Sequence, residues 1–540
     1  MIPKIHELLL ASLGVLVIAC NTRKENVKSA SPQPKQVVAA DLAGSFSAQT
    51  SLKLDSASVE SFFVLYPSVA PFEADIRLFY SRRHFAFAWF DPKGEIEQAG
   101  NLYNRIQNLP DEGLANRRVP YLSSLDSLMN DPDTKEHKTR LEKELLLTAS
   151  YFYFAQSVWG GLDEKSIRKM DWFLPRKKLS YDAWLDYYLK SPGGFAATGE
   201  PVYRQYGLLR GILKKYMDIV RENPWAPLKG EQKAYRLGDS AKVLADIRTR
   251  LALLGDLPGA SGHPSAGASV FDSVLLKAVT HFQQRFGIKP DGIIGQEMIR
   301  ELNVPIQKRI QQICVNMERA RWLPDTVKGN YLAVNIPEFK LHAYKDDSLL
   351  WDMDVVVGTA VHKTVIFSGD LKYVVFSPYW NVPPGILKNE ILPGIRKNKS
   401  YLAIHHMEWY GNTVRQTPGS WNSLGKVKFL FPNSYNIYLH DTPAKSLFGE
   451  DRRAFSHGCI RVADPLKLSL FVLDGDLQWN VQKITAAMNS RREQYVTLKK
   501  NIPVFITYFT AWVDRQGDIQ FRHDVYARDG RLMEAIAGRP

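Results

Sequence analysis

The chain has 540 residues, of which 45% are hydrophobic and 23% are charged, a composition that excludes general disorder and a polytopic membrane protein. At about 150 residues per domain, this length predicts three or four domains. The net charge of +14 favours an anionic partner, and three cysteines, Cys20, Cys314 and Cys459, are too few for a disulfide framework or a cysteine-rich zinc site.

The first twenty residues predict an export signal. Lys4 precedes an apolar run at 8–19 that is too short to cross about 30 Å of hydrocarbon. The run ends on a small residue before Cys20, which resembles a lipoprotein signal and implies cleavage before Cys20 and its lipidation. An ordinary signal peptide or a poor anchor helix remains the alternative. Residues 21–45, rich in Ser, Ala, Gln, Lys and Pro, predict a flexible tether. We therefore expect an envelope or periplasmic protein, anchored to a membrane by lipid, and no nucleic-acid partner.

Residues 46–225 predict a mainly helical scaffold domain. Leu145, Ala149 and Phe152 fall on one helical face, and the apolar residues of 209–220 repeat that spacing. No group of residues here suggests catalysis, so its aromatic side chains are expected in a core.

Residues 236–305 predict a compact unit of three helices. Asp272 is a suitable N-cap for a helix that buries Phe282 and Phe286 and ends at Gly287. The run of Phe-Gln at 282–283, Gly-Ile at 287–288, Asp-Gly at 291–292 and Gly295 resembles the small three-helix peptidoglycan-binding domain. Three helices without a ligand are the alternative. A linking helix is expected across 306–328, with Cys314 as a buried apolar residue.

From about residue 329 to 540 the apolar period changes to two, which predicts a β-rich domain. Residues 384–426 interrupt it as one insertion. Across 384–430 the sequence has seven basic and two acidic residues, a balance of +5. We expect this insertion to form a basic lid.

The chemistry centres on Cys459, in the run Ser-His-Gly-Cys-Ile-Arg-Val at 456–462. Asp464 and Pro465 predict a helix start just after this loop. Gly458 allows backbone N–H groups to turn toward a developing oxyanion. A cysteine nucleophile needs a base, and His440 lies 19 residues upstream. On a strand, Tyr438 and His440 share one face.

Four runs together resemble the L,D-transpeptidase family. They are the signature at 456–462, His-Asp-Thr-Pro at 440–443, Tyr-Trp-Asn-Val-Pro-Pro at 379–384 and Phe-Leu-Phe-Pro-Asn at 429–433. They look like the larger Gram-negative type, with scaffold, peptidoglycan-binding and capping regions. The resemblance implies a multidomain α+β fold whose β-rich catalytic domain carries a capping insertion.

The resemblance implies Cys459 as nucleophile and His440 as general base, oriented by a backbone carbonyl near Asp441. A triad through the Asp441 carboxylate is the less favoured alternative, because adjacent strand residues point to opposite faces. His457 is a rival base, but we favour a role in shaping the loop or donating a hydrogen bond beside Gly458. Arg461 is expected to bind a substrate carboxylate or to pin the loop through a salt bridge.

Tyr438 and Trp380 are expected to line the peptide cleft, with core packing as the alternative for Trp380.

The implied function is peptidoglycan L,D-transpeptidation, which forms 3→3 cross-links between stem peptides through a thioester on Cys459. No metal or organic cofactor is implied. Carboxypeptidation, D-amino acid exchange or protein tethering by the same cysteine stay open. So do a non-enzymatic peptidoglycan-binding lipoprotein and a cysteine protease or amidase.

Overall fold

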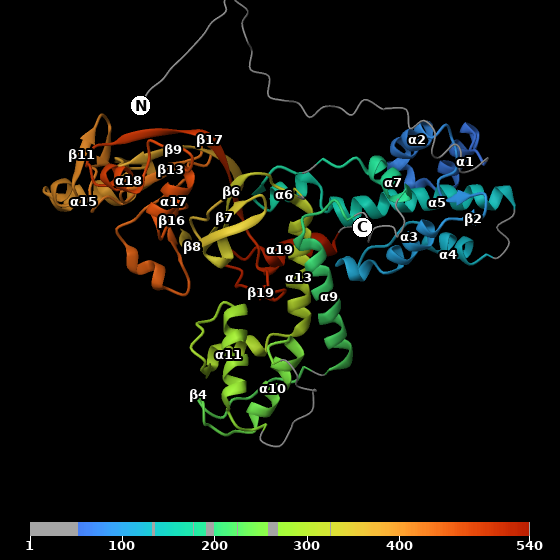
Figure 1. Ribbon diagram of the computed structural model, residues 1–540, viewed down its shortest axis with the longest axis horizontal. Helices are drawn as coiled ribbons and strands as arrows, with labels where there is room; N and C mark the ends of the chain where they lie inside the picture. The colour runs from blue at the N-terminus through green and yellow to red at the C-terminus, as the bar shows by residue number, and fades with distance from the viewer. Residues whose placement is uncertain are drawn as a thin grey trace, which may run out of the picture.

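The computed structural model describes residues 52–538, apart from 132–135, 177, 191–198, 224, 258–267 and 325. The signal, the tether and Cys20 therefore lie outside the described residues. Figure 1 shows a helical scaffold, a small helical unit and a β-rich domain arranged around two central helices. The multidomain α+β fold predicted from the sequence is confirmed. Of the helices described, none has the length and apolar character needed to cross a membrane.

The scaffold packs its helices around a dense aromatic core. At the centre is α5, whose face with Leu145, Ala149 and Phe152 is fully buried, as its spacing predicts. The described helices of the scaffold are α1 (Ser56–Leu65), α2 (Glu73–Arg82), α3 (Glu97–Gln107), α4 (Leu122–Asn130), α5 (His137–Ala155), α6 (Glu164–Lys169), α7 (Tyr181–Lys190) and α9 (Gln205–Glu222). Two short strands, β1 (Phe90–Asp91) and β2 (Gly94–Glu95), form a hairpin beside them.

The small unit has the three helices expected from the sequence: α10 (Val243–Leu254), α11 (Ser273–Arg285) and α12 (Gln296–Leu302), with β4 (Ala234–Tyr235) paired to β5 (Ile294–Gly295). The Asp272 carboxylate accepts a hydrogen bond from the Leu275 N–H and so caps α11. Gly287 follows α11 at φ +64°, a conformation that costs other residues energy.

Helix α13 (Ile306–Trp322) joins this unit to the β-rich domain and lies beside α9 (Figure 1). Its C-terminal end is held by buried charges. The Arg321 guanidinium pairs with Glu318 at 2.7 Å and donates to the Val158 carbonyl of the scaffold at 2.8 Å. The ion pair lies within α13 and balances a buried charge that would be costly to leave unpaired. The bond to the Val158 carbonyl joins α13 to the scaffold. Cys314 is buried here, and burial raises the pKa of its thiol to about 11, which keeps it inert.

The β-rich domain is built on a ten-stranded sheet in the order β13-β14-β16-β8-β7-β6-β17-β9-β3, with β15 paired to β8. Because β13 also pairs with β9, the sheet closes on itself. The strands are β3 (Trp172–Phe173), β6 (Asn330–Asn335), β7 (Lys340–Lys345), β8 (Ser348–Gly358), β9 (Ile366–Phe376), β13 (Val427–Leu430), β14 (Leu439–His440), β15 (Ala454–Ser456), β16 (Ile460–Val462) and β17 (Gln494–Thr507). Strand β3 comes from the scaffold and extends the sheet, which the sequence did not indicate.

Helices α17 (Pro465–Val472), α18 (Val481–Met488) and α19 (Asp529–Ala537) pack with this domain, and β18 (Ala511–Val513) pairs with β19 (Ile519–Phe521) as a C-terminal hairpin. Asp464 caps α17 by accepting from the Lys467 N–H, and Pro465 is its first residue, as predicted.

The insertion forms a subdomain with its own core, made by Val382, Ile391 and Val414. Its sheet is β10 (Trp380–Asn381), β12 (Thr413–Gln416) and β11 (Met407–Tyr410), so the subdomain begins before residue 384. Its helices are α14 (Pro384–Ile386), a π-helical turn (Leu387–Ile391), α15 (Leu392–Lys397) and α16 (Tyr401–Ile404). We call this subdomain the cap.

Candidate active site

Two short parallel strands bring the predicted catalytic residues together. In the pairing of β14 with β16, Leu439 lies opposite Ile460 and His440 lies opposite Arg461. The Ile460 N–H also donates to the Tyr438 carbonyl at 3.1 Å. Cys459 immediately precedes β16, so this register sets the cysteine level with Tyr438, beside the start of β14.

His440 is buried and is held by the backbone. Its Nδ1 lies 2.5 Å from the carbonyl oxygen of Asp441, which only an Nδ1–H donor can satisfy. Burial, and then the positive charge of Arg461, lowers the pKa of His440 to about 4. The imidazole is therefore neutral near pH 7, with a free electron pair on Nε2.

The Asp441 carboxylate is engaged elsewhere. It accepts a hydrogen bond from the Lys426 N–H at 2.8 Å and pairs with the Lys445 Nζ at 2.7 Å. The side chain thus anchors the chain around β14, while its own carbonyl contacts the imidazole.

The Cys459 thiol is partly buried, and burial raises its pKa. Its Sγ lies 3.5 Å from the Asn436 carbonyl oxygen. Across the described part of the chain, no hydrogen bond joins this thiol to His440. The thiol and the imidazole are therefore both neutral at rest, and the proton must move during attack.

A network of buried hydrogen bonds fixes the loop that carries Cys459. Gly458 has φ +115°, which favours glycine. The Thr364 hydroxyl donates to the Gly458 carbonyl and accepts from the Gly358 N–H, both at 2.9 Å. Tyr526 from the C-terminal segment donates to the Gly358 carbonyl at 2.8 Å. The sequence did not indicate Thr364 or Tyr526, because only the closed sheet brings them here.

Arg461 and Tyr438 flank the thiol. Burial lowers the pKa of Arg461, and the interaction with Cys459 opposes this shift once the thiol has lost its proton. Its Nε has no hydrogen-bond partner, and no carboxylate of the described residues pairs with it. The Tyr438 ring lies 5.7 Å from that of His440, on the same side of the strand. Burial, and then the charge of Cys459, raises the pKa of Tyr438.

His457 and Trp380 each contact residues of the cap. The His457 imidazole is half exposed and lies 3.6 Å from the carboxylate of Glu390 in the cap. Its ring is 4.9 Å from that of His362. Trp380 packs against the small apolar core of the cap, which favours the packing role. No cluster of metal-ligating side chains occurs among the residues described.

Three segments of the chain match models of known protein families. Residues 329–484 match the family model of the L,D-transpeptidase catalytic domain. The β-rich domain is therefore similar to the L,D-transpeptidase catalytic domain. Residues 74–213 match a "Scaffold domain" and residues 242–302 a "Putative peptidoglycan binding domain". The resemblance noted in the sequence is thereby confirmed.

A Haemophilus influenzae protein named "Putative L,D-transpeptidase" is 31% identical over 242 residues, which are 41% of this chain and 49% of that protein. The chain thus spans about half the length of this curated relative. A solved L,D-transpeptidase from Stackebrandtia nassauensis is 14% identical, covering 52% of this chain and 97% of that one, with a TM-score of 0.21. A solved L,D-transpeptidase from Xylanimonas cellulosilytica is 12% identical, covering 52% of this chain and 100% of that one, with a TM-score of 0.18. Scores this low support no inference about this chain.

Proposed function

We propose that this protein is an L,D-transpeptidase that forms 3→3 cross-links in peptidoglycan through a thioester on Cys459. The observation that carries the proposal is the neutral His440 imidazole, buried and fixed through Nδ1 beside a neutral thiol. That arrangement suits a base that accepts the thiol proton only when the nucleophile attacks.

In the acylation step, the Cys459 Sγ attacks the carbonyl carbon of the third stem residue, a diamino acid. His440 Nε2 takes the thiol proton, and backbone N–H groups of the Gly458 loop stabilise the oxyanion. When the carbon–nitrogen bond breaks, the imidazolium gives that proton to the leaving amine of D-Ala. The product is a thioester and a neutral imidazole.

In the second step, the side-chain amine of an acceptor stem attacks the thioester carbonyl. His440 accepts a proton from this amine and returns it to the departing Cys459 sulfur. A new amide joins two third residues, and the enzyme regains its thiol. In this proposal the Arg461 guanidinium, which has no carboxylate partner in the described chain, binds a carboxylate of the stem peptides.

The cap supplies positive charge near this site. Lys388, Arg396, Lys397 and Lys399 are exposed, and none forms an ion pair with a described residue. By contrast, Arg415 is paired with Glu408 at 2.6 Å. The unpaired cations are free to attract anionic stem peptides over roughly a Debye length of 8–10 Å.

Peptidoglycan-related domains suggest a site of action in the cell envelope. The finer proposal, a lipoprotein anchored through Cys20, rests on the sequence before that residue. It predicts that Cys20→Ala releases the protein from the membrane without altering the catalytic domain.

The test of the function is the analysis of muropeptides made by the purified protein from sacculi rich in tetrapeptide stems. We expect dimers linked between two diamino acids, with release of D-Ala, and none with Cys459→Ala. Tripeptides without dimers would instead identify a carboxypeptidase. Exchange of D-Ala for an added D-amino acid, or attachment of a protein amine, would identify the other acceptors. No product of any kind would refute the catalytic proposal in favour of a binding protein.

A further inference from the structure

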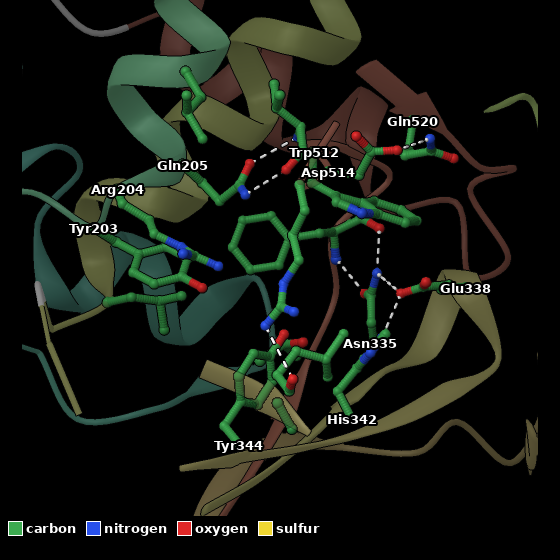
Figure 2. Close-up of a pocket in the computed structure, with 18 of the residues that line it drawn as sticks. Tyr203, Arg204, Gln205, Asn335, Glu338, His342, Tyr344, Trp512, Asp514 and Gln520 are labelled. Atoms are coloured by element: carbon green, nitrogen blue, oxygen red, sulfur yellow. Dashed lines mark hydrogen bonds and ion pairs between the residues drawn. The ribbon is translucent and has the colours of Figure 1, made fainter. Parts of the chain in front are cut away.

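A cavity of about 740 Å³ lies between the scaffold and the catalytic domain (Figure 2). Its walls come from the start of α9, from β6, β7 and β17, and from the hairpin of β18 and β19. It shares no lining residue with the site around Cys459. Its volume is in the range of about 300–1,000 Å³ found for sites that bind small molecules.

Aromatic side chains from three parts of the chain form these walls. Tyr331 and Tyr344 stack with ring centroids 4.8 Å apart and nearly parallel planes, and Phe505 meets Tyr331 edge-on. Tyr203 stands on the scaffold side and Trp512 on the hairpin side (Figure 2). Such rings offer flat apolar faces with a polar tip at the edge.

Polar groups of the lining remain available for a ligand. The Nδ1 of His342 is buried and has no hydrogen-bond partner in the described chain. Its Nε2 lies 2.9 Å from the Glu338 carboxylate, so the ring orientation is fixed and Nδ1 is the free atom. A buried polar atom without a partner is unusual in a native protein and marks a position for a ligand hydroxyl or amide.

The lining carries charged side chains of both signs. Arg204 and Arg515 stand against three carboxylates, those of Glu338, Asp352 and Asp514. An anionic stem peptide would gain little from this mixture. A neutral ligand with many hydroxyl and amide groups and flat C–H faces fits both the aromatic walls and the mixed donors and acceptors.

We propose that this cavity binds a short stretch of glycan strand, a chain of N-acylated amino sugars. The proposal rests on the proposed function only in taking peptidoglycan as the polymer to which this ligand belongs. Pyranose rings would stack on Trp512 and Tyr344, and an amide or hydroxyl would bond the His342 Nδ1.

Hydrogen bonds between separate parts of the chain hold the walls of the cavity together, so a bound glycan would contact parts whose relative positions are fixed. The Gln205 amide at the start of α9 donates to the Val513 carbonyl at 2.7 Å and accepts from its N–H at 2.8 Å. On the other strand of the hairpin, the carbonyl of Ile519, which pairs with Val513, accepts a hydrogen bond from Arg285 of the small helical unit at 2.9 Å. A glycan in the cavity would therefore hold the strand at a fixed place relative to all three parts.

The test uses the full chain and triacetylchitotriose, an uncharged trimer of N-acetylglucosamine. Calorimetry should give a Kd that Trp512→Leu and Tyr344→Leu each raise by about tenfold, the scale of one lost aromatic contact. Tyr495→Ala, an exposed aromatic on β17 outside the cavity, is the matched control and should leave the Kd unchanged. Thermal melting of each variant verifies folding.

Hydroxyl-radical footprinting of the wild-type protein provides a second measurement that needs no variant. Bound trimer should protect Tyr203, Tyr344 and Trp512 from oxidation. Protection confined to residues 236–305, or an unchanged Kd in both cavity variants, would overturn the proposal. Tighter binding of a free stem tetrapeptide than of the trimer would also overturn it. Carbapenem acylation of Cys459, measured on the same samples, reports separately on the proposed enzymatic function.

Discussion

Replacing His440 by alanine is the perturbation that examines the catalytic pair most closely. Because burial raises the pKa of Cys459 above its ordinary value, and a free cysteine of pKa about 8.5 is only a few per cent thiolate at neutral pH, the unaided thiolate fraction is very small. Loss of the base should therefore slow acylation by about 10²–10⁴-fold.

The pH dependence of the wild-type protein gives a sharper magnitude. With the His440 pKa at about 4, about 97% of the imidazole is neutral at pH 5.5, whereas an ordinary histidine of pKa about 6.5 would be only about a tenth neutral. The acylation rate should therefore change by less than about twofold between pH 7.5 and 5.5, and fall only as the pH approaches 4. In His440→Ala the rate should rise about tenfold per pH unit below the pKa of the Cys459 thiol and level off above that pKa, because the thiol then ionises without help.

Intact-mass spectrometry of protein quenched at intervals after mixing with a carbapenem measures these rates. Asp441→Asn is the matched control: it keeps the backbone carbonyl that contacts His440 and loses only the charge that pairs with Lys445, so its rate should change by a few-fold at most. A tenfold loss in the wild type between pH 7.5 and 5.5, or a His440→Ala rate within a few-fold of wild type, would refute the neutral-pair reasoning. A severe defect in folded Asp441→Asn would restore the side-chain triad.

Three further predictions concern the hydrogen bonds of Thr364, the second described cysteine and the charges of the cap. Thr364→Val removes the buried hydroxyl that bonds Gly358 and Gly458, so denaturant unfolding should show a loss of about 1–3 kcal/mol together with slower acylation; unchanged values of both would contradict the role given to this network. Cys314→Ala should retain full acylation and lose about 1 kcal/mol through a small cavity, and an inactive but folded variant would contradict the assignment of the nucleophile. Reversing the exposed Lys397 and Lys399 to glutamate should weaken the use of stem peptide more than reaction with a small neutral thiol reagent, with a difference that shrinks at high salt; equal losses with both reagents would contradict a role for the cap charge.

Much of the fold follows from local sequence signals. The cap of α11 by Asp272, the end of that helix at Gly287 and the start of α17 at Asp464 and Pro465 all lie where short-range chemistry predicts them. Each of these features is determined by residues close to one another in the sequence, so it can be predicted from the sequence alone.

Features made by distant segments could not be predicted in this way. The pairing of β3 with β9 joins positions 172 and 366, and the bond from Tyr526 to Gly358 spans 168 residues. The alternation of Tyr438 and His440 does predict their shared face. However, the low pKa of His440 depends on burial by the whole sheet, which no local pattern reports.

The central claim is that Cys459 carries the acyl group of a donor stem. Its most direct test is intact-mass spectrometry of the protein mixed with a disaccharide tetrapeptide and quenched in acid before turnover is complete. The account predicts a mass increase equal to the donor less D-Ala, on the peptide that contains Cys459, and none in Cys459→Ala. An adduct on any other residue, or cross-linked product formed by Cys459→Ala, would contradict it.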